Sequence, residues 1–398
     1  MKSYKCEKGI GKKEEANTIG KRIGGMGNMA NVYLCIGTMK TGTSSLQTFM
    51  KKNEDALKKQ GYCYPSNFIT GRNILNRNAF FLVYKPYSEN EPSSEEIWNK
   101  GMERIAELAA KFENIVLSDE LIWHYSGRRE NFWQRTKEAF EKIGCQVKVV
   151  VYLRRQDELV QSLWNQNVKS GERWNITFEE FIEKKKYRYF PLNYHKKLTQ
   201  IAAVMGKENV IVRVYEREQF EGHDLIIDYT KTLGIKLNDD FQTLDETINP
   251  SLQGNFVEIR RMINGVPVYQ EMPDFLRRPL IKASVEREDV VPMKKINLFN
   301  YEDQLAFLNR YAKSNEKVAR EFLGREDGIL FYKPIKEEKQ YDPHNDKILG
   351  EFIHFSVNYM CQQQQKILEL KQKISENQQQ EVSFVKKAYR KLKKMVNK

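Results

Sequence analysis

The chain has 398 residues, with 66 Lys and Arg against 53 Asp and Glu, so its formal net charge is +13. Hydrophobic residues make up 40% of the chain, enough for a sizeable core, which excludes a wholly disordered protein. No apolar run reaches the roughly 18 residues of a transmembrane helix, and the N-terminal segment lacks the apolar stretch of a secretory signal. The five cysteines are scattered without CxxC spacing, which argues against structural zinc and a disulfide framework. These features favour a soluble, cytoplasmic protein with reduced thiols and anionic partners.

Three zones differ in composition. Residues 1–29 are rich in Lys and Gly without a hydrophobic period, and we expect this N-terminal extension to be disordered. Residues 30–335 alternate apolar runs with helical patterns, whereas residues 336–398 are polar and partly Gln-rich. Seven cations and no acid lie in Lys386–Lys398, so more than half of the excess charge belongs to the tail. The body is therefore only mildly basic, and we expect no specific nucleic-acid partner.

Four apolar runs in the middle zone are typical of short buried strands: Val32–Ile36, Ile115–Leu117, Val147–Leu153 and Val210–Tyr215. Helical patterns separate them, at Ser44–Lys59, Ser94–Phe112, Asn131–Ile143 and Gln156–Lys169. Strands that alternate with helices predict an α/β fold with three layers, α/β/α, around a central and mainly parallel sheet. Ligands of such sheets bind at the carboxyl ends of the strands, so the residues just after each strand are the candidates for chemistry.

The segment after the first strand, Gly37–Ser45, has the composition of an anion-binding loop. Its two glycines permit a tight turn, and the helix that follows points its N-terminal amides and dipole at the ligand. Lys40 adds a positive charge, and the three residues after Gly42 add hydroxyl donors. The glycines have the spacing of the nucleoside-triphosphatase loop GxxxxGK[ST], but Thr43 stands where that motif has its lysine.

Ile36–Leu46 resembles the 5′-phosphosulfate loop of sulfotransferases that use 3′-phosphoadenosine 5′-phosphosulfate (PAPS), whose lysine also stands in mid-loop. The resemblance implies a P-loop NTPase-like sheet, with Lys40 at the bridging oxygen of the leaving phosphate. It also implies that the loop backbone and hydroxyls hold the 5′-phosphate. The cofactor-binding residues implied in this loop are Gly37, Thr38, Lys40, Thr41, Gly42, Thr43, Ser44 and Ser45.

A second segment follows the third apolar run. Arg154 stands at the strand end, and Ser162 lies eight residues later, about two helical turns at 3.6 residues per turn. This arrangement resembles the 3′-phosphate motif of the same sulfotransferases. An arginine can hold a phosphate through two parallel hydrogen bonds, and a serine hydroxyl adds another donor. Arg155, at a spacing of seven, is the competing candidate.

The family places its catalytic base after an intervening strand, which corresponds to the residues after Ile115–Leu117. The acceptor hydroxyl must lose a proton as it attacks sulfur, and a positioned base must accept that proton. Glu120, the carboxylate closest after the strand end, is the first candidate, and His124 is the second. Asp119 would point to the other side if the chain stays extended. Helix capping by Asp119 and packing of His124 are the structural alternatives.

The resemblance, to the bacterial carbohydrate-directed branch, implies a sulfotransferase domain at 30–335. Its activity would be sulfuryl transfer from PAPS to a hydroxyl of a glycan or glycolipid. No metal is implied, and the sequence has no evident cluster of metal ligands.

Two other functions remain open. A P-loop kinase acting on a small molecule or sugar would need magnesium, and Thr43 counts against it. A non-catalytic anion- or nucleic-acid-binding protein would depend on the basic tail and show steep salt dependence.

The tail predicts a long helix. A heptad series with polar interruptions predicts a weak coiled coil, through which copies could form a homo-oligomer: Leu349, Ile353, Met360, Ile367, Leu370 and Ile374. A second apolar stripe, surrounded by lysines, comprises Val385, Ala388, Tyr389, Leu392 and Val396. A basic amphipathic helix of this kind is typical of a membrane-surface or partner-binding element. We therefore expect peripheral contact with an anionic membrane at its inner, cytoplasmic face.

Overall fold

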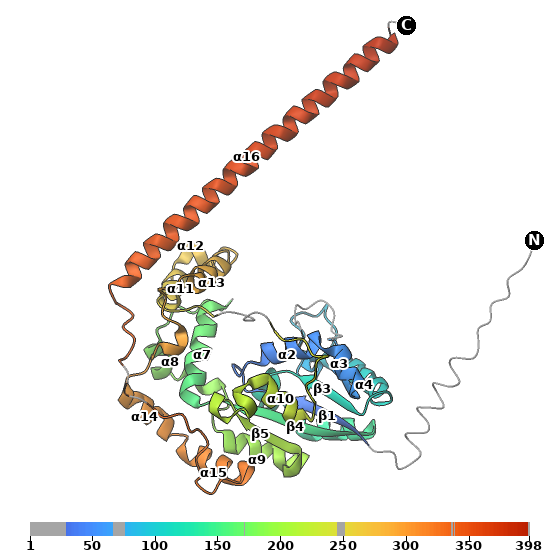
Figure 1. Cartoon of the computed structure of the whole chain (residues 1–398), viewed down its shortest axis with the longest axis vertical. Helices are drawn as coiled ribbons and strands as arrows, with labels where there is room; N and C mark the ends of the chain where they lie inside the picture. Colours follow the sequence, from blue (N-terminus) through green and yellow to red (C-terminus); the bar gives the residue numbers. More distant parts are fainter. Residues whose placement is uncertain are drawn as a thin grey trace, which may run out of the picture. The chain divides into compact units, whose positions relative to one another are not determined.

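The computed structural model describes residues 29–66, 76–170, 172–244, 251–335, 337 and 339–396 (Figure 1). The predicted N-terminal extension, apart from Met29, lies outside these residues. The chain divides into two compact units. Unit 1 comprises Met1–Trp164, Phe178–Asn249 and Leu298–Lys339, and unit 2 comprises Asn165–Thr177, Pro250–Asn297 and Gln340–Lys398.

Unit 1 is built on one five-stranded sheet in which every neighbouring pair is parallel. Its strands are β1 (Ala30–Cys35), β2 (Tyr62–Cys63), β3 (Asn114–Ser118), β4 (Cys145–Leu153) and β5 (Val210–Val214). The order across the sheet is β2-β3-β1-β4-β5. The chain therefore builds the sheet on one side of β1 and then crosses to the other side. Such a reversal opens a crevice at the carboxyl ends of the central strands, where ligands of α/β proteins bind.

Alternating side chains of the strands bury both faces of the sheet. Val32 and Leu34 of β1 belong to one hydrophobic cluster, which includes side chains of α4, α6 and α9. Tyr33 and Cys35 belong to a second cluster, which includes side chains of α2, α3 and α10 (Figure 1). Because strand side chains alternate in direction, this double burial produces three layers, helices over sheet over helices. The predicted α/β/α architecture is confirmed.

Unit 1 contains the helices α2 (Thr43–Lys52), α3 (Glu54–Lys59), α4 (Ser94–Ala109), α5 (Leu121–Tyr125), α6 (Phe132–Lys142), α7 (Gln156–Lys169), α8 (Phe178–Glu183), α9 (Tyr194–Met205), α10 (Leu225–Leu233), α14 (Tyr301–Asn309) and α15 (Ala312–Leu323). The last residues of α7, from Asn165 on, belong to unit 2. Short 3-10 turns occur in both units, at Phe80–Leu82, Ser126–Arg128, Lys186–Tyr189, Lys207–Asn209, Arg217–Gln219, Glu221–His223 and Met293–Lys295.

The prediction of a single helix over Ser44–Lys59 is wrong in one respect, because the structure has two separate helices there, α2 and α3. Asn53 stands between them. Its side-chain amide donates to the carbonyl of Phe49 at 2.9 Å and its side-chain oxygen accepts from the amide of Gln242 at 2.7 Å. An Asn side chain that bonds the backbone in this way offers an alternative to helical hydrogen bonds and ends the helix.

Unit 2 is helical. It contains α11 (Phe256–Asn264), α12 (Pro267–Gln270), α13 (Arg277–Glu286) and the 50-residue helix α16 (Lys347–Val396). The predicted long C-terminal helix is confirmed. Ile348 and Phe355 near the start of α16 are buried, and the Phe355 ring lies 6.3 Å from that of Phe256 on α11. Across the described residues, no helix has both the length and the apolarity needed to cross a membrane.

Gly101 of α4 offers a test of the packing in unit 1. A Cβ atom at this position would lie 2.2 Å from the ring of Phe81, which is almost fully buried. We expect Gly101→Ala to lower the free energy of unfolding by about 1–3 kcal/mol, the usual cost of overpacking. Urea denaturation measures this change.

The matched control is Gly350→Ala on α16, where an added Cβ meets nothing within 4 Å. This variant should keep or raise stability, by up to about 1 kcal/mol from helix propensity. Equal stability of the two variants would contradict the packing described here.

Candidate active site

The loop between β1 and α2 is held in an unusual backbone conformation. Gly37, Lys40 and Gly42 have φ values of 68°, 66° and 74°. A Cβ atom on Gly37 would lie 2.9 Å from Cβ of Glu120, and one on Gly42 would lie 2.5 Å from Cδ2 of Leu225. The positive φ values and the short distances favour glycine at both positions, most strongly at Gly37, where the neighbouring atom is a Cβ fixed to the backbone.

Two threonine hydroxyls fasten the loop from within. The amide and the hydroxyl of Thr38 both donate to the carbonyl of Tyr152 on β4, at 2.9 and 3.1 Å. The hydroxyl of Thr41 donates to the carbonyl of Thr38 at 2.7 Å, and both threonines are buried. Both hydroxyls and the Thr38 amide are engaged in shaping the loop, so neither threonine side chain is available to a ligand.

The start of α2 provides the donors that the loop motif predicts. Gly42 is the N-cap residue, and no side chain in the described structure caps this end of the helix. The first amides of a helix have no partner within the helix, and the helix dipole makes this end positive. Thr43, Ser44 and Ser45 are partly buried around these amides. The arrangement is suited to an anion with several acceptor oxygens.

Arg154 brings the end of β4 to this loop. One of its Nη atoms donates to the carbonyl of Lys40 at 2.8 Å, and its Nε lies 3.4 Å from a carboxylate oxygen of Glu158. Its guanidinium lies 5.6 Å from the ring centre of Tyr215, and its own carbonyl accepts from the hydroxyl of Tyr194 at 2.5 Å. The arginine is partly exposed, so it can exchange the Glu158 contact for a phosphate.

Arg155, the competing candidate, is placed differently. It is buried and forms a bidentate ion pair with Asp157, at 2.8 and 2.9 Å, and it donates to the carbonyl of Lys333 at 2.8 Å. These contacts give it a structural role. Ser162 is partly buried on α7, and among the described residues no hydrogen bond joins it to Arg154. Among the described residues, a hydrogen bond therefore joins Arg154 to the loop, whereas none joins Ser162 to the loop or to Arg154.

Lys40 lies in a positive environment. Its pKa is lowered, first by burial and then by the Arg154 guanidinium, whereas the Glu120 carboxylate opposes the shift. Two cations held this close repel each other in the absence of an anion between them. The loop consequently favours a ligand that carries negative charge.

Glu120 lies on the other side of the loop, after β3. One oxygen of its carboxylate accepts from the side-chain amide of Gln47 at 3.3 Å and lies 3.9 Å from Nε of Arg77. Its side chain is 18% exposed, so a substrate can reach it. The short distance between Gly37 and the Glu120 side chain places Glu120 beside the loop between β1 and α2. Lys40, Arg154 and Glu120 thus converge from the ends of β1, β4 and β3.

Asp119 serves the structure around Glu120. Its buried carboxylate accepts from Arg77 at 2.7 and 3.2 Å and from the amide of Leu121 at 2.8 Å, which begins α5. Burial raises the pKa of Asp119 to about 6, the Arg77 guanidinium opposes that rise, and the Glu120 charge adds to it. The two adjacent carboxylates therefore have different environments: Asp119 is buried and paired, and Glu120 is partly exposed.

His124, the second base candidate, lies on α5 away from the loop contacts described above. Its ring packs 5.0 Å from that of Phe190 and 4.7 Å from that of Tyr125. Its pKa is lowered from 6.5 to about 4, first by burial and then by the nearby cations Arg128 and Lys197. Its Nδ1 atom is buried without a hydrogen-bond partner in the described structure. An imidazole with so low a pKa is a weak proton acceptor.

Gln47 and Arg77 were missed by the sequence analysis. The sequence did contain a signal for Gln47, because it is a polar residue among the buried apolar positions of α2. It is itself buried, and its amide also contacts the hydroxyl of Ser118 at 3.2 Å. No sequence signal pointed to Arg77, because it lies outside any strand or helix and contacts Asp119 only in the folded chain.

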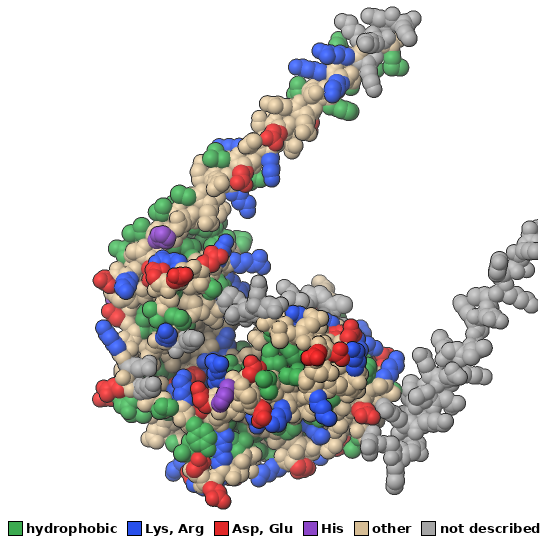
Figure 2. Space-filling view, viewed as in Figure 1, with side chains coloured by type: hydrophobic (Ala, Val, Ile, Leu, Met, Phe, Trp, Pro, Cys, Tyr) green, Lys and Arg blue, Asp and Glu red, His purple; other side chains and the backbone are tan. Residues whose placement is uncertain are grey.

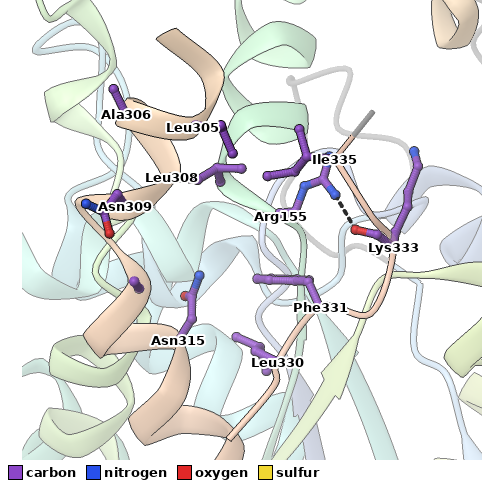
Figure 3. A pocket seen from close by; sticks show the side chains of 11 residues that line it. Arg155, Leu305, Ala306, Leu308, Asn309, Asn315, Leu330, Phe331, Lys333 and Ile335 are labelled. Atoms are coloured by element: carbon purple, nitrogen blue, oxygen red, sulfur yellow. Dashed lines mark hydrogen bonds between the residues drawn. The ribbon is translucent and has the colours of Figure 1, made fainter. Parts of the chain in front are cut away.

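A separate cavity of about 520 Å³ lies elsewhere in unit 1 (Figure 3). Its walls are mostly apolar and come from α14, α15 and the segment 330–335, with the Arg155 side chain at one edge. The dashed line in Figure 3 is the hydrogen bond from Arg155 to the Lys333 carbonyl. None of the residues of the loop between β1 and α2 lines this cavity, so it is distinct from the candidate active site. Among the described residues, no group of three His, Cys, Asp or Glu could hold a metal ion.

Comparisons with known proteins give limited information. No family model matches the chain. The chain is 29% identical over 222 residues to an uncharacterized protein of Archaeoglobus fulgidus, a match that covers 56% of this chain and 57% of that protein. The chain thus matches little more than half the length of this curated relative. It also resembles the crystal structure of a sulfotransferase from Alicyclobacillus acidocaldarius, with a TM-score of 0.35 and 18% identity, over 55% of this chain and 86% of that one. At that TM-score, no conclusion about this chain rests on the likeness.

Lys197 of α9 makes the stability of this region depend on pH. Its ammonium group is buried and donates to the hydroxyl of Ser126 at 2.7 Å, and burial lowers its pKa from 10.5 to about 8. Between these two values the unfolded chain binds more protons than the folded one, so this residue makes stability rise with pH. The unfolding free energy of wild type, relative to Lys197→Met, should rise by up to about 3 kcal/mol from pH 7 to pH 10.

Urea denaturation at several pH values measures this difference. Lys196→Met, at the exposed neighbouring position on the same helix, is the matched control and should track wild type at every pH. A Lys197→Met curve that runs parallel to wild type would show that the buried ammonium has no such effect.

Proposed function

We propose that the protein is a sulfotransferase that transfers the sulfuryl group of PAPS to a hydroxyl of a carbohydrate acceptor. One observation carries the proposal. The guanidinium of Arg154 is hydrogen-bonded to the carbonyl of Lys40, so the arginine of the second motif lies beside the loop of the first, which supports a shared nucleotide site. They are 114 residues apart in the chain and meet only through the parallel pairing of β1 with β4.

The residues present fit such a nucleotide. The amides at the start of α2 and the hydroxyls of Thr43, Ser44 and Ser45 would hold its 5′-phosphate, and Arg154 would hold its 3′-phosphate. The positive charge of Lys40 would offset the negative charge that grows on the leaving phosphate. Fixed donors aimed at developing charge are a main source of rate enhancement in group transfer. When bound, PAPS supplies the sulfuryl group that passes to the acceptor oxygen.

Glu120 is the proposed general base. It lies beside Gly37 at the mouth of the loop, its carboxylate is accessible, and Gln47 and Arg77 limit its movement. It would take the proton of the acceptor hydroxyl as that oxygen attacks sulfur. The His124 ring packs against Phe190 and its buried Nδ1 has no hydrogen-bond partner in the described structure, whereas Glu120 adjoins Gly37, and this placement argues for Glu120 over the histidine. The carbohydrate acceptor is inferred only from the resemblance of the sequence to the carbohydrate-directed branch of the sulfotransferases.

The nucleotide site can be tested with adenosine 3′,5′-bisphosphate, the product nucleotide. Titration calorimetry without magnesium should show binding to wild type, weakened more than about tenfold, or 1.4 kcal/mol, by Arg154→Ala or Lys40→Ala. Each substitution removes a cation that would contact the nucleotide. Arg104→Ala, at an exposed arginine of α4, is the control and should bind like wild type. If folded protein instead binds only ATP with magnesium, the sulfotransferase proposal fails.

The base can be tested by Glu120→Gln, which keeps the shape of the side chain but removes its proton affinity. Transfer of radiolabelled sulfate from PAPS to a panel of oligosaccharides and glycolipids should fall about 10²–10⁴-fold. Binding of adenosine 3′,5′-bisphosphate should stay unchanged. Glu113→Gln, at an exposed position just before β3, is the matched control. Full activity of Glu120→Gln together with loss in His124→Ala would assign the base to the histidine.

A further inference from the structure

The C-terminal end of α16 carries large hydrophobic side chains that nothing in the described structure covers. From Met360 to Lys387 every residue of the helix is exposed. The exposed fractions near the C-terminal end are 53% for Val382, 75% for Phe384, 63% for Val385, 66% for Tyr389, 61% for Leu392 and 76% for Met395. Side chains of this size, exposed together on one element, mark an interaction surface.

These hydrophobic residues share one side of the helix. At 3.6 residues per turn, Val385, Leu392 and Tyr389 fall within one apolar face, and Val382 and Phe384 fall at its margins. Lys386, Lys387 and Arg390 fall on the opposite half, together with Ser383. Figure 2 shows basic and hydrophobic side chains gathered together near this end of α16. The segment is therefore sharply amphipathic, and its polar half is basic.

The charge of the segment identifies the partner that it fits. Lys386–Lys398 contains seven cations and no acid. A second copy of this helix would bring the same positive charges against the first, and like charges repel. A nucleic acid would satisfy the cations but leave the apolar face in water. An anionic lipid surface satisfies both halves, because its headgroups pair with the cations and its acyl region receives the apolar face.

The length of α16 makes the segment available to such a surface. The helix is anchored in unit 2 near its start, where Phe355 is buried against Phe256. Val382 lies 27 residues further along the same helix, which at 1.5 Å per residue is about 40 Å from Phe355. The amphipathic segment is therefore free of the packing that holds the start of the helix.

We propose that the segment Val382–Val396 lies along an anionic membrane surface, with Val385, Tyr389 and Leu392 inserted at the headgroup boundary. This inference is independent of the sulfuryl-transfer reaction. It places the enzyme at the surface of a bilayer, where lipid-linked or surface-bound acceptors would be within reach. Two signals act together, the apolar face and the basic face, and both are needed for stable attachment.

Flotation of the full-length protein with vesicles tests the proposal. Wild type should float with vesicles of phosphatidylcholine and phosphatidylglycerol in equal amounts, but not with phosphatidylcholine alone. Val385→Asp/Leu392→Asp should lower the bound fraction by at least about tenfold, because two apolar anchors are replaced by charges that anionic lipid repels. Gln362→Asp/Gln365→Asp adds the same charge at exposed positions upstream on α16 and should bind like wild type. Circular dichroism confirms that all variants keep their helix content.

Three results would overturn the proposal. The first is the absence of wild-type binding to anionic vesicles. The second is equal loss in both double variants, which would show that net charge alone governs binding. The third is a lipid-free oligomer, seen by sedimentation equilibrium, that Val385→Asp/Leu392→Asp converts to monomers, because the apolar face would then be a contact between copies.

Discussion

The parallel pairing of β1 with β4 is the constraint on which the site depends. It sets the end of β4 beside the loop after β1, so that the Tyr152 carbonyl receives two hydrogen bonds from Thr38 and Arg154 reaches the carbonyl of Lys40. The loop is thus fixed to the neighbouring strand at two points before any ligand arrives. A site held in this way loses little entropy when an anion binds, which is the physical meaning of preorganisation.

Opposite charges are separated across the same loop. Lys40 and Arg154 gather on the side of β4, whereas Asp119 and Glu120 follow β3 on the other side of β1. Arg77 pairs with the buried Asp119 and leaves the Glu120 carboxylate accessible. This division suits a reaction in which one partner is an anion and the other must lose a proton. Two adjacent carboxylates thus have different surroundings: Asp119 holds Arg77 and the start of α5, and Glu120 is left accessible for the role proposed for it.

The strands and the glycine loop between β1 and α2 could be predicted because each depends on local sequence. Runs such as Val147–Leu153 are buried on both faces and therefore mostly apolar, and glycines with positive φ mark the turn from a strand into a helix. Gln47 and Arg77 could not be predicted with the same means, since their role arises from contacts across 73 and 42 residues of the chain. The split between α2 and α3 was missed because Asn53 acts through a contact with Gln242, far away in sequence.

A crystal structure with adenosine 3′,5′-bisphosphate tests the central claim most directly, that the ends of β1, β3 and β4 form one nucleotide-binding active site. The account predicts the 5′-phosphate at the amides that begin α2, the 3′-phosphate within hydrogen-bond distance of Arg154, and Glu120 beside the position of the missing sulfuryl group. A nucleotide bound elsewhere, for example in the cavity beside Arg155, or one whose phosphates do not contact Lys40 and Arg154, would contradict it.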